Sequence, residues 1–364
     1  MSEGREVPLI VLGVGGVGRS FLEQIVRRRS YHEKRYDVRF KIVALADSTG
    51  AAVSPAGLTD EEIQQAIEAK AQGGRLSDLP FGYYQNDVRS IVDLEATQDT
   101  VVVDMTASTE TMSALQLAME RRSYIVLANK LPLTAPISRA WALYEYPRLR
   151  YETTVGAALP VITTAKRLAA SGESIQRIMG VLSGTLGYLM TAVEDGVAFS
   201  KAVLKAKELG YTEPDPREDL SGRDVARKGL ILARTLGWRL EMEDVQVQSL
   251  YPEEWDTWPL EDVMAELIAL DDDFFAWVDA ARARHEALRY VAKLEDGRVE
   301  VGIQFVPLDS PLGRLRGTDN LVEFYTEYYD PQPLVLAGRG AGVHSTAAGV
   351  LSDILELVLY PWLP

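Results

Sequence analysis

The sequence contains no cysteine among its 364 residues. This absence excludes disulfides, thiolate metal sites and every mechanism that uses a cysteine nucleophile. No stretch approaches the ~18 consecutive apolar residues that a membrane helix needs, and the short polar start leads directly into an expected strand. We therefore expect a cytoplasmic protein with neither a membrane span nor an export signal.

Basic residues are fewer than acidic ones, with 38 Lys and Arg against 53 Asp and Glu, so the formal net charge is −15. No run of Lys and Arg offsets this balance, and a nucleic-acid partner is not expected because its phosphates would be repelled. The 47% hydrophobic and 25% charged residues are typical of a globular protein. At roughly 100–200 residues per domain, the length predicts two domains.

The first part of the chain alternates apolar runs with helical patterns, which predicts a Rossmann-type parallel sheet, an α/β domain. The expected strands are 7–12, 40–46, 100–103 and 124–128, and the expected helices are 16–29, 59–71 and 109–122. A helix at 160–170 and strands at 175–182, 288–294, 299–305 and 321–328 predict a second, α+β domain. We expect residues 1–152 together with 338–364 to form a dinucleotide-binding domain, 153–337 to form a substrate domain, and the catalytic cleft to lie between them.

Glycines follow the first expected strand in the pattern G-x-G-x-x-G, in the stretch Gly13-Val14-Gly15-Gly16-Val17-Gly18. The first glycine allows the turn, the second admits a pyrophosphate, and the third allows helix and strand to pack closely. Asp47 ends the second strand, where a carboxylate binds the adenosine ribose. It lies farther along than usual, and a polar insertion at 30–39 explains the extra length. A solvated strand end is the alternative for Asp47.

Lys130 follows Asn129 at the carboxyl end of the strand 124–128, the edge where such sheets bind ligands. There it could meet the nicotinamide or the substrate oxygen. The alternative is an ordinary surface lysine.

The stretch from Gly210 to Lys228 concentrates acidic residues after two prolines. We expect a helix to begin near Asp219, whose carboxylate caps it. Asp224 and Lys228 are then four residues apart on one face, with the acid before the base. Together with Glu213, Asp224 and Lys228 are typical of a site that binds a zwitterion. The alternative is a solvated helical ion pair worth ~0.3–0.5 kcal/mol.

These residues resemble homoserine dehydrogenases over nearly the whole chain. Gly210 to Lys228 matches the long signature of that family, which is specific, whereas the glycine motifs alone are not. Further matches are Gly13 to Gly18, Asn129-Lys130, Thr106 with Ala107 at the end of a cofactor-binding strand, Glu152 to Pro160, Ser183 to Gly187, and Gly340 to Gly342.

The resemblance implies NAD(P)-dependent interconversion of L-aspartate 4-semialdehyde and L-homoserine in threonine, methionine and isoleucine biosynthesis. It implies that Lys130 and Lys228 flank the reacting carbonyl, while Glu213 and Asp224 hold the amino end of the substrate with Asp219 in support. Partly desolvated lysines suit proton transfer. We assign this role to Lys228 and charge stabilisation to Lys130, and the sequence leaves the opposite assignment open.

Further expectations follow from the same resemblance. Gly184 and Thr185 belong to a substrate loop, and Thr106, Ala107, Lys130 and Gly342 join the glycine loop in binding the cofactor. Backbone carbonyls of Glu152, Val155, Ala157 and Leu159 bind a monovalent cation such as Na⁺, or else the loop is an ordinary interdomain turn. The sheet of the second domain forms a homodimer.

The cofactor argument favours NAD over NADP. Asp47 would repel a 2′-phosphate, and residues 48–50 contain no arginine to neutralise one. Arg75, after two glycines in the next connection, is the nearest candidate to rescue NADP binding, and a solvated loop arginine is its alternative.

Two other functions are weighed against this one. Aspartate-semialdehyde dehydrogenase also pairs a dinucleotide fold with an α+β domain, but its chemistry needs a cysteine. A dinucleotide sensor without catalysis predicts the loss of Lys130, Glu213, Asp224 or Lys228, and all four are present. Because little sequence flanks the expected domains, we expect neither a regulatory domain nor a fused aspartate kinase.

Overall fold

The computed structural model describes residues 4–85 and 87–360. The chain divides into two compact units, Met1–Ala158 with Gly342–Pro364, and Leu159–Ala341. The boundaries thus differ by a few residues from those expected at 152 and 338. Gly338 and Arg339 lie in the second unit because they pair with Asn320 and Asp319 of the neighbouring strand. No helix in the described ranges is long and apolar enough to cross a membrane.

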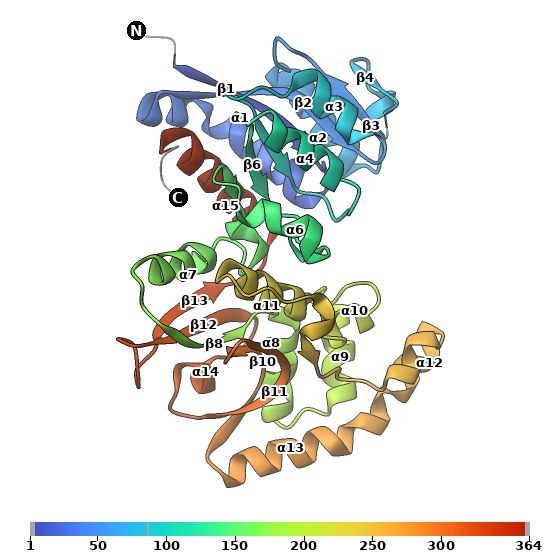
Figure 1. Cartoon of the computed structure of the whole chain (residues 1–364). Coiled ribbons are helices and arrows are strands. Elements are labelled where there is room, and N and C mark those ends of the chain that lie inside the picture. Colours follow the sequence, from blue (N-terminus) through green and yellow to red (C-terminus); the bar gives the residue numbers. More distant parts are fainter. Residues whose placement is uncertain (1–3, 86, 361–364) are drawn as a thin grey trace. The chain divides into compact units, whose positions relative to one another are not determined.

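The first unit is built on a seven-stranded sheet in the order β4-β3-β2-β1-β5-β6-β7 (Figure 1). Its strands are β1 (Arg5–Leu12), β2 (Val38–Asp47), β3 (Gly50–Val53), β4 (Gly82–Tyr83), β5 (Val101–Asp104), β6 (Tyr124–Leu127) and β7 (Leu149–Arg150). Five neighbouring strands of this sheet, β2, β1, β5, β6 and β7, are parallel to one another. Beyond β2, the strands β3 and β4 extend the sheet with antiparallel pairing. The predicted α/β class is confirmed.

Helices surround this sheet, and their apolar sides join the buried strands in one core. They are α1 (Gly16–Tyr36), α2 (Asp60–Ala71), α3 (Val88–Glu95), α4 (Met112–Glu120), α5 (Leu131–Thr134), α6 (Ile137–Tyr144), α15 (Val343–Leu359) and the 3-10 helices η1 (Leu76–Asp78) and η2 (Glu152–Thr154). The last of the α-helices, α15, packs against α1 and β6.

The helix α1 is longer than the sequence predicts. The expected polar insertion at 30–39 is mostly helical, because α1 continues to Tyr36 and is followed by Asp37 as its C-cap, in a left-handed conformation with φ of 54°. Buried His32 packs edge-on against Phe40 of β2, which explains why this charged segment stays on the sheet. The extra separation between the glycines and Asp47 is therefore about two additional helical turns.

The second unit contains a six-stranded sheet in the order β13-β12-β8-β10-β11-β9. Its strands are β8 (Ile175–Val181), β9 (Gln246–Val247), β10 (Glu286–Glu295), β11 (Arg298–Pro307), β12 (Asp319–Thr326) and β13 (Leu334–Arg339). All pairings are antiparallel except that of β9 with β11. This is the α+β arrangement that the sequence predicts.

The helices of the second unit include the one expected to carry the site. They are α7 (Val161–Ala170), α8 (Gly184–Glu194), α9 (Phe199–Glu208), α10 (Arg217–Leu220), α11 (Arg223–Thr235), α12 (Leu260–Glu266), α13 (Asp271–Ala283), α14 (Pro311–Arg314) and the 3-10 helices η3 (Met242–Asp244), η4 (Glu253–Thr257) and η5 (Leu267–Leu270).

The helix expected to begin near Asp219 begins at Arg223, so the prediction of an Asp219 cap is wrong. A short helix, α10, precedes it, and Gly222 separates the two with φ of 69° and no side-chain cap. A Cβ at Gly222 would lie 1.9 Å from the hydroxyl of buried Tyr290. The break is set by this tertiary contact, which the local sequence does not reveal.

Candidate active site

The glycine loop between β1 and α1 has the geometry of a phosphate cradle. Gly13 has φ of +97°, and a Cβ there would lie 2.8 Å from the carbonyl of Met105. A Cβ at Gly18 would lie 2.0 Å from the Gly13 oxygen, whereas one at Gly15 would meet nothing within 4 Å. Gly15 caps α1 without a side chain, and the first turn holds no acidic residue. The open side of the loop therefore suits an anion at the helix N-terminus.

The rest of this loop packs against its own unit. Val17 lies against the hydrophobic core. A Cβ at Gly16 would lie 3.1 Å from the side chain of Val343, which directly follows Gly342 at the start of α15. The Ser20 hydroxyl lies 2.7 Å from Nδ1 of His344. Gly342 is thus beside the glycine loop, as a shared cofactor site requires.

A buried polar network joins the carboxyl ends of β5 and β6. Asp104 accepts hydrogen bonds from the Thr106 N–H and hydroxyl at 2.9 and 2.7 Å and from the Asn129 amide at 3.0 Å. Burial raises the pKa of Asp104, and these bonds oppose the shift. The network fixes the turn that carries Thr106 and exposed Ala107 as well as the start of α5, where Lys130 is half-buried.

Asp47 lies at the end of β2, as expected, but its carboxylate already has partners. It accepts hydrogen bonds from the Thr49 N–H at 2.7 Å and hydroxyl at 2.5 Å, and Lys70 of α2 pairs with it at 2.8 Å. The side chain of Lys70 is only 14% exposed. Lys70 is therefore the cation that neutralises Asp47, and Arg75, the residue considered for rescuing NADP binding, is exposed. Sequence reasoning missed Lys70 because it lies in a helix that returns to this edge only in the fold.

The loop proposed to bind a cation is tightly folded. Glu152 begins η2, and Val155 and Ala157 are buried; Ala157 has φ of 55°, a left-handed conformation that is costly for alanine. Asp353 of α15 accepts a hydrogen bond from the Glu152 N–H at 3.1 Å, and burial raises the pKa of Asp353 well above its usual range. Leu159 is the first residue of the second unit.

Lys228 on α11 has two partners within the second unit. Its ammonium lies 2.8 Å from the Asp224 carboxylate, one turn earlier on the helix, and donates to the Leu182 carbonyl at 2.7 Å. The Lys228 side chain is 12% exposed and that of Asp224 is 41% exposed. The predicted pairing of Asp224 with Lys228 is confirmed, and it holds the ammonium at the end of β8.

Acidic residues of the signature gather around the preceding loop. Asp219 accepts a hydrogen bond from the Glu213 N–H at 2.8 Å, which fixes the backbone that presents exposed Glu213. Burial raises the pKa of Asp219, and the charges of Glu213 and Asp224 raise it further. The Thr185 hydroxyl donates to the Tyr211 carbonyl at 2.5 Å. Thr185, Glu213, Asp219 and Asp224 therefore form one cluster.

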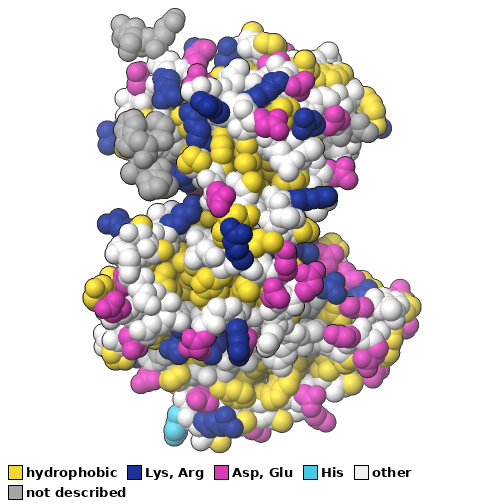
Figure 2. Space-filling model, in the orientation of Figure 1, with side chains coloured by type: hydrophobic (Ala, Val, Ile, Leu, Met, Phe, Trp, Pro, Cys, Tyr) yellow, Lys and Arg dark blue, Asp and Glu magenta, His cyan; other side chains and the backbone are white. Residues whose placement is uncertain are grey.

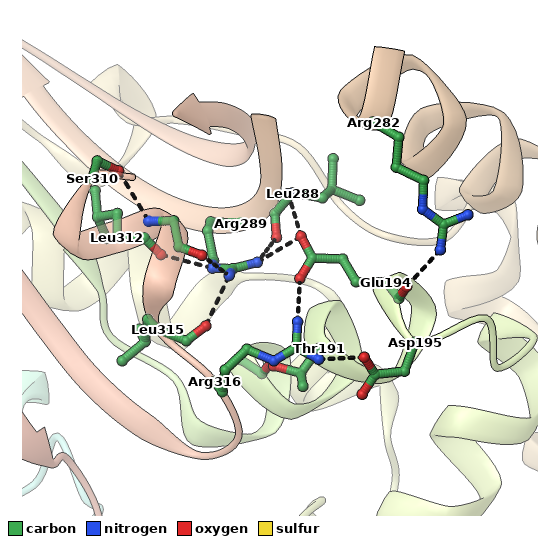
Figure 3. A network of polar contacts seen from close by, with 12 residues as sticks. Thr191, Glu194, Asp195, Arg282, Leu288, Arg289, Ser310, Leu312, Leu315 and Arg316 are labelled. Carbon is green, nitrogen blue, oxygen red and sulfur yellow. Dashed lines mark hydrogen bonds and ion pairs between the residues drawn. The ribbon is translucent and has the colours of Figure 1, made fainter. Parts of the chain in front are cut away.

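A network of polar contacts fixes the far end of α8, whose first residues are Gly184 and Thr185 (Figure 3). The Glu194 carboxylate accepts hydrogen bonds from the Leu288 N–H and from Arg289 at 2.7 and 2.8 Å and pairs with Arg316 at 2.9 Å. Arg289 is 2% exposed and also donates to three carbonyls of residues 312–315. Near the other end of α8, a Cβ at Gly184 would lie 3.0 Å from the Thr318 carbonyl.

Basic and acidic side chains are interspersed on the face shown in Figure 2 rather than gathered into separate surfaces. Within the described residues, no group of three or more His, Asp or Glu side chains could hold a metal ion. The expected site residues therefore form two constellations, a glycine loop with its strand ends in the first unit and the Lys228 cluster in the second.

Comparison with known proteins identifies similar chains. The family model described as homoserine dehydrogenase matches residues 160–355. A bifunctional aspartokinase/homoserine dehydrogenase from Haemophilus influenzae is 36% identical over 96% of this chain, which spans only 42% of that protein. The homoserine dehydrogenase of Paracoccidioides brasiliensis is 34% identical over 98% of both chains.

A solved structure shares the fold. A hyperthermophilic archaeal homoserine dehydrogenase in complex with NADPH is 23% identical, with a TM-score of 0.75 over 99% of both chains. The match to the family model and the full-length similarity to the Paracoccidioides enzyme together identify the family. This chain belongs to the homoserine dehydrogenase family.

Proposed function

We propose that this chain catalyses the NAD(P)-dependent interconversion of L-aspartate 4-semialdehyde and L-homoserine. The observation that carries the proposal is the half-buried ammonium of Lys228, which Asp224 and the Leu182 carbonyl hold, while burial and, after it, the charges of Glu213 and Asp224 raise the pKa of Asp219. The test is to follow NADH absorbance with aspartate semialdehyde as substrate. No oxidation of NADH above the rate without enzyme would overturn the proposal.

We propose that the first unit binds the dinucleotide. The open backbone at Gly15 fits a pyrophosphate, and no acidic side chain in the first turn of α1 opposes it. Thr106, Ala107 and Lys130 line the adjoining strand ends, and Gly342 begins the neighbouring helix. A dinucleotide held there would supply the hydride chemistry of the reaction.

Lys228 transfers the proton to the carbonyl oxygen in this proposal, and Lys130 stabilises the negative charge that develops there. Asp224 and the Leu182 carbonyl orient the Lys228 ammonium from two directions. In the reverse reaction Lys228 takes the proton back from the alcohol.

The substrate ammonium group binds to Glu213 and Asp224 in this proposal. Asp219 fixes the Glu213 backbone, and Thr185 fixes the Tyr211 carbonyl. The Thr212 hydroxyl between them is buried and has no hydrogen-bond partner within the described part of the chain, which fits a loop that contacts a polar ligand. Gly184 allows α8 to begin close to the Thr318 backbone.

We propose that NAD(H) gives the higher kcat/KM and that NADP(H) is also accepted. Asp47 favours ribose hydroxyls, whereas Lys70 lowers the repulsion that a 2′-phosphate meets. The NADPH complex of the archaeal relative is compatible with such acceptance. Asp47→Ser is expected to narrow the NAD preference and Lys70→Ala to widen it. A tenfold or greater preference of the unaltered protein for NADPH, about 1.4 kcal/mol, would contradict this assignment.

We propose that the backbone carbonyls of Glu152, Val155, Ala157 and Leu159 bind Na⁺. The tight left-handed turn at Ala157 supports this, because strained backbone persists where surrounding structure or a ligand requires it. Activity measured after dialysis into a choline salt should recover on adding Na⁺. Equal activity in both salts would argue against the site.

We also propose a cytoplasmic homodimer formed through the sheet of the second unit. One cavity on this unit, of about 830 Å³, is lined by apolar and charged residues of β8, β11 and β12, including Met179, Phe305 and Glu323. A surface that combines apolar and charged side chains in this way suits a second copy of the chain. Light scattering should give twice the chain mass of 40.3 kDa.

A further inference from the structure

Asn320, at the start of β12, carries a side-chain amide that is fully buried and unpaired. Its exposure is 0%, and neither Oδ1 nor Nδ2 has a hydrogen-bond partner among residues 4–85 and 87–360. Buried polar groups almost always have partners, so an asparagine with both amide groups unpaired requires an explanation.

The sheet register places Asn320 next to the Lys228 site. Leu321 pairs with Val181, the last residue of β8, so Asn320 lies beside Leu182. The Leu182 carbonyl is the one that accepts the Lys228 hydrogen bond. Asn320 is therefore one strand away from the backbone group that orients the proposed proton donor.

Asn320 also lies on the face of the sheet that α11 covers. Val322 and Ala292 both pair with Gly180, so they share one face, and Asn320 joins them because it lies two residues before Val322. A Cβ at Gly229 of α11 would lie 3.6 Å from the Ala292 Cβ, which identifies this face as the one under the helix.

The third neighbour of Asn320 is the turn after β13. A Cβ at Gly340 would lie 1.8 Å from the Asn320 Cγ, so the amide occupies the space that any larger residue at 340 would need. The amide is thus wedged between the end of β8 and the Gly340 backbone without bonding to either. A leucine has nearly the same shape and would fill this space without an unpaired polar group.

We propose that Asn320 is a positioning residue that binds a water molecule linking the end of β8 to the Gly340 turn, and so fixes the Leu182 carbonyl that orients Lys228. A water molecule is the smallest group that can both accept from Nδ2 and donate to Oδ1. The inference rests on the proposed function, because it assigns Asn320 a role in presenting the Lys228 ammonium.

The test replaces the amide with an apolar group of the same shape. Asn320→Leu should lower kcat about tenfold through a displaced Leu182 carbonyl, and it should change Tm little, because the leucine fills the space that the amide and its water molecule leave. The Kd for NADH should not change, and the substrate KM should change by less than about threefold, because Glu213 and Asp224 remain. Asn320→Ser, whose hydroxyl both donates and accepts, should recover most of kcat.

The matched control is Thr326→Val at the other end of the same strand. Thr326 is equally buried, but its hydroxyl accepts hydrogen bonds from the Tyr328 and Tyr329 N–H groups. This variant should lower Tm and leave kcat unchanged, the reverse of the expected Asn320→Leu result.

Three outcomes would overturn the inference. Full kcat in Asn320→Leu means that the amide has no role, and a large loss of Tm means that it is a structural hydrogen-bonding group. A higher Kd for NADH in Asn320→Leu, with kcat unchanged, means that the amide contributes to cofactor binding. An inactive unaltered protein would overturn the proposed function and the inference together, whereas the first three results leave the proposed function intact.

Discussion

Lys228 is the residue on which the proposed chemistry depends most directly. Lys228→Ala removes the ammonium that Asp224 and the Leu182 carbonyl hold at 2.8 and 2.7 Å. We expect kcat to fall by about 10²–10⁴-fold, the usual contribution of a positioned proton donor, while NADH binding persists. Rapid kinetics and NADH fluorescence titration would separate the two effects. A loss smaller than tenfold would assign proton transfer to another group, with Lys130 the first candidate.

His32 predicts how stability depends on pH. Burial lowers its pKa, and the charge of Arg28 lowers it further, so the folded protein holds the neutral ring while the unfolded chain takes up a proton near pH 6.5. The unfolded state then binds more protons, and stability falls as the pH drops below this value. Denaturant midpoints measured between pH 7.5 and 5 should fall less in His32→Phe than in the unaltered protein. Parallel curves for the two proteins would contradict this assignment.

At the scale of single elements, two glycine variants near the start of α1 separate an effect on cofactor binding from an effect on the stability of the fold. Gly15→Val adds a side chain where a Cβ meets nothing within 4 Å, so Tm without cofactor should hardly change while the Kd for NADH rises at least tenfold. Gly18→Val is the matched control, because its Cβ would lie 2.0 Å from the Gly13 oxygen and should destabilise the fold itself. Thermal melts with and without NADH check both. Unchanged NADH affinity in Gly15→Val would place the pyrophosphate elsewhere.

The elements that the sequence predicts correctly are those that local pattern determines. Fully buried strands such as β5 and β6 are short apolar runs, and Asp224 pairs with Lys228 because four residues make about one helical turn. The misplaced start of α11 depends instead on the Tyr290 hydroxyl, which lies where a Cβ of Gly222 would be. Lys70, the Leu182 carbonyl and Asn320 join the candidate sites only through sheet pairing and the return of a helix. No local sequence pattern predicts such contacts between distant segments.

At the scale of the whole molecule, the two units have separate sheets and separate clusters of buried apolar residues. Each unit also holds one of the two candidate constellations. Ligands should therefore slow backbone amide exchange in different units, because bound ligand suppresses the local openings from which exchange occurs.

Hydrogen exchange measured by mass spectrometry tests this division directly. NADH alone should protect peptides that cover 9–19, 101–108 and 126–131 of the first unit, where the glycine loop, Thr106 and Lys130 lie. Homoserine, added with NAD omitted to prevent turnover, should protect 183–187 and 211–228 of the second unit, where Thr185, Glu213 and Lys228 lie. Gly15→Val should abolish the first pattern and preserve the second. Protection of the 211–228 peptides by NADH alone, with none at 9–19, would reverse the assignment of the two units.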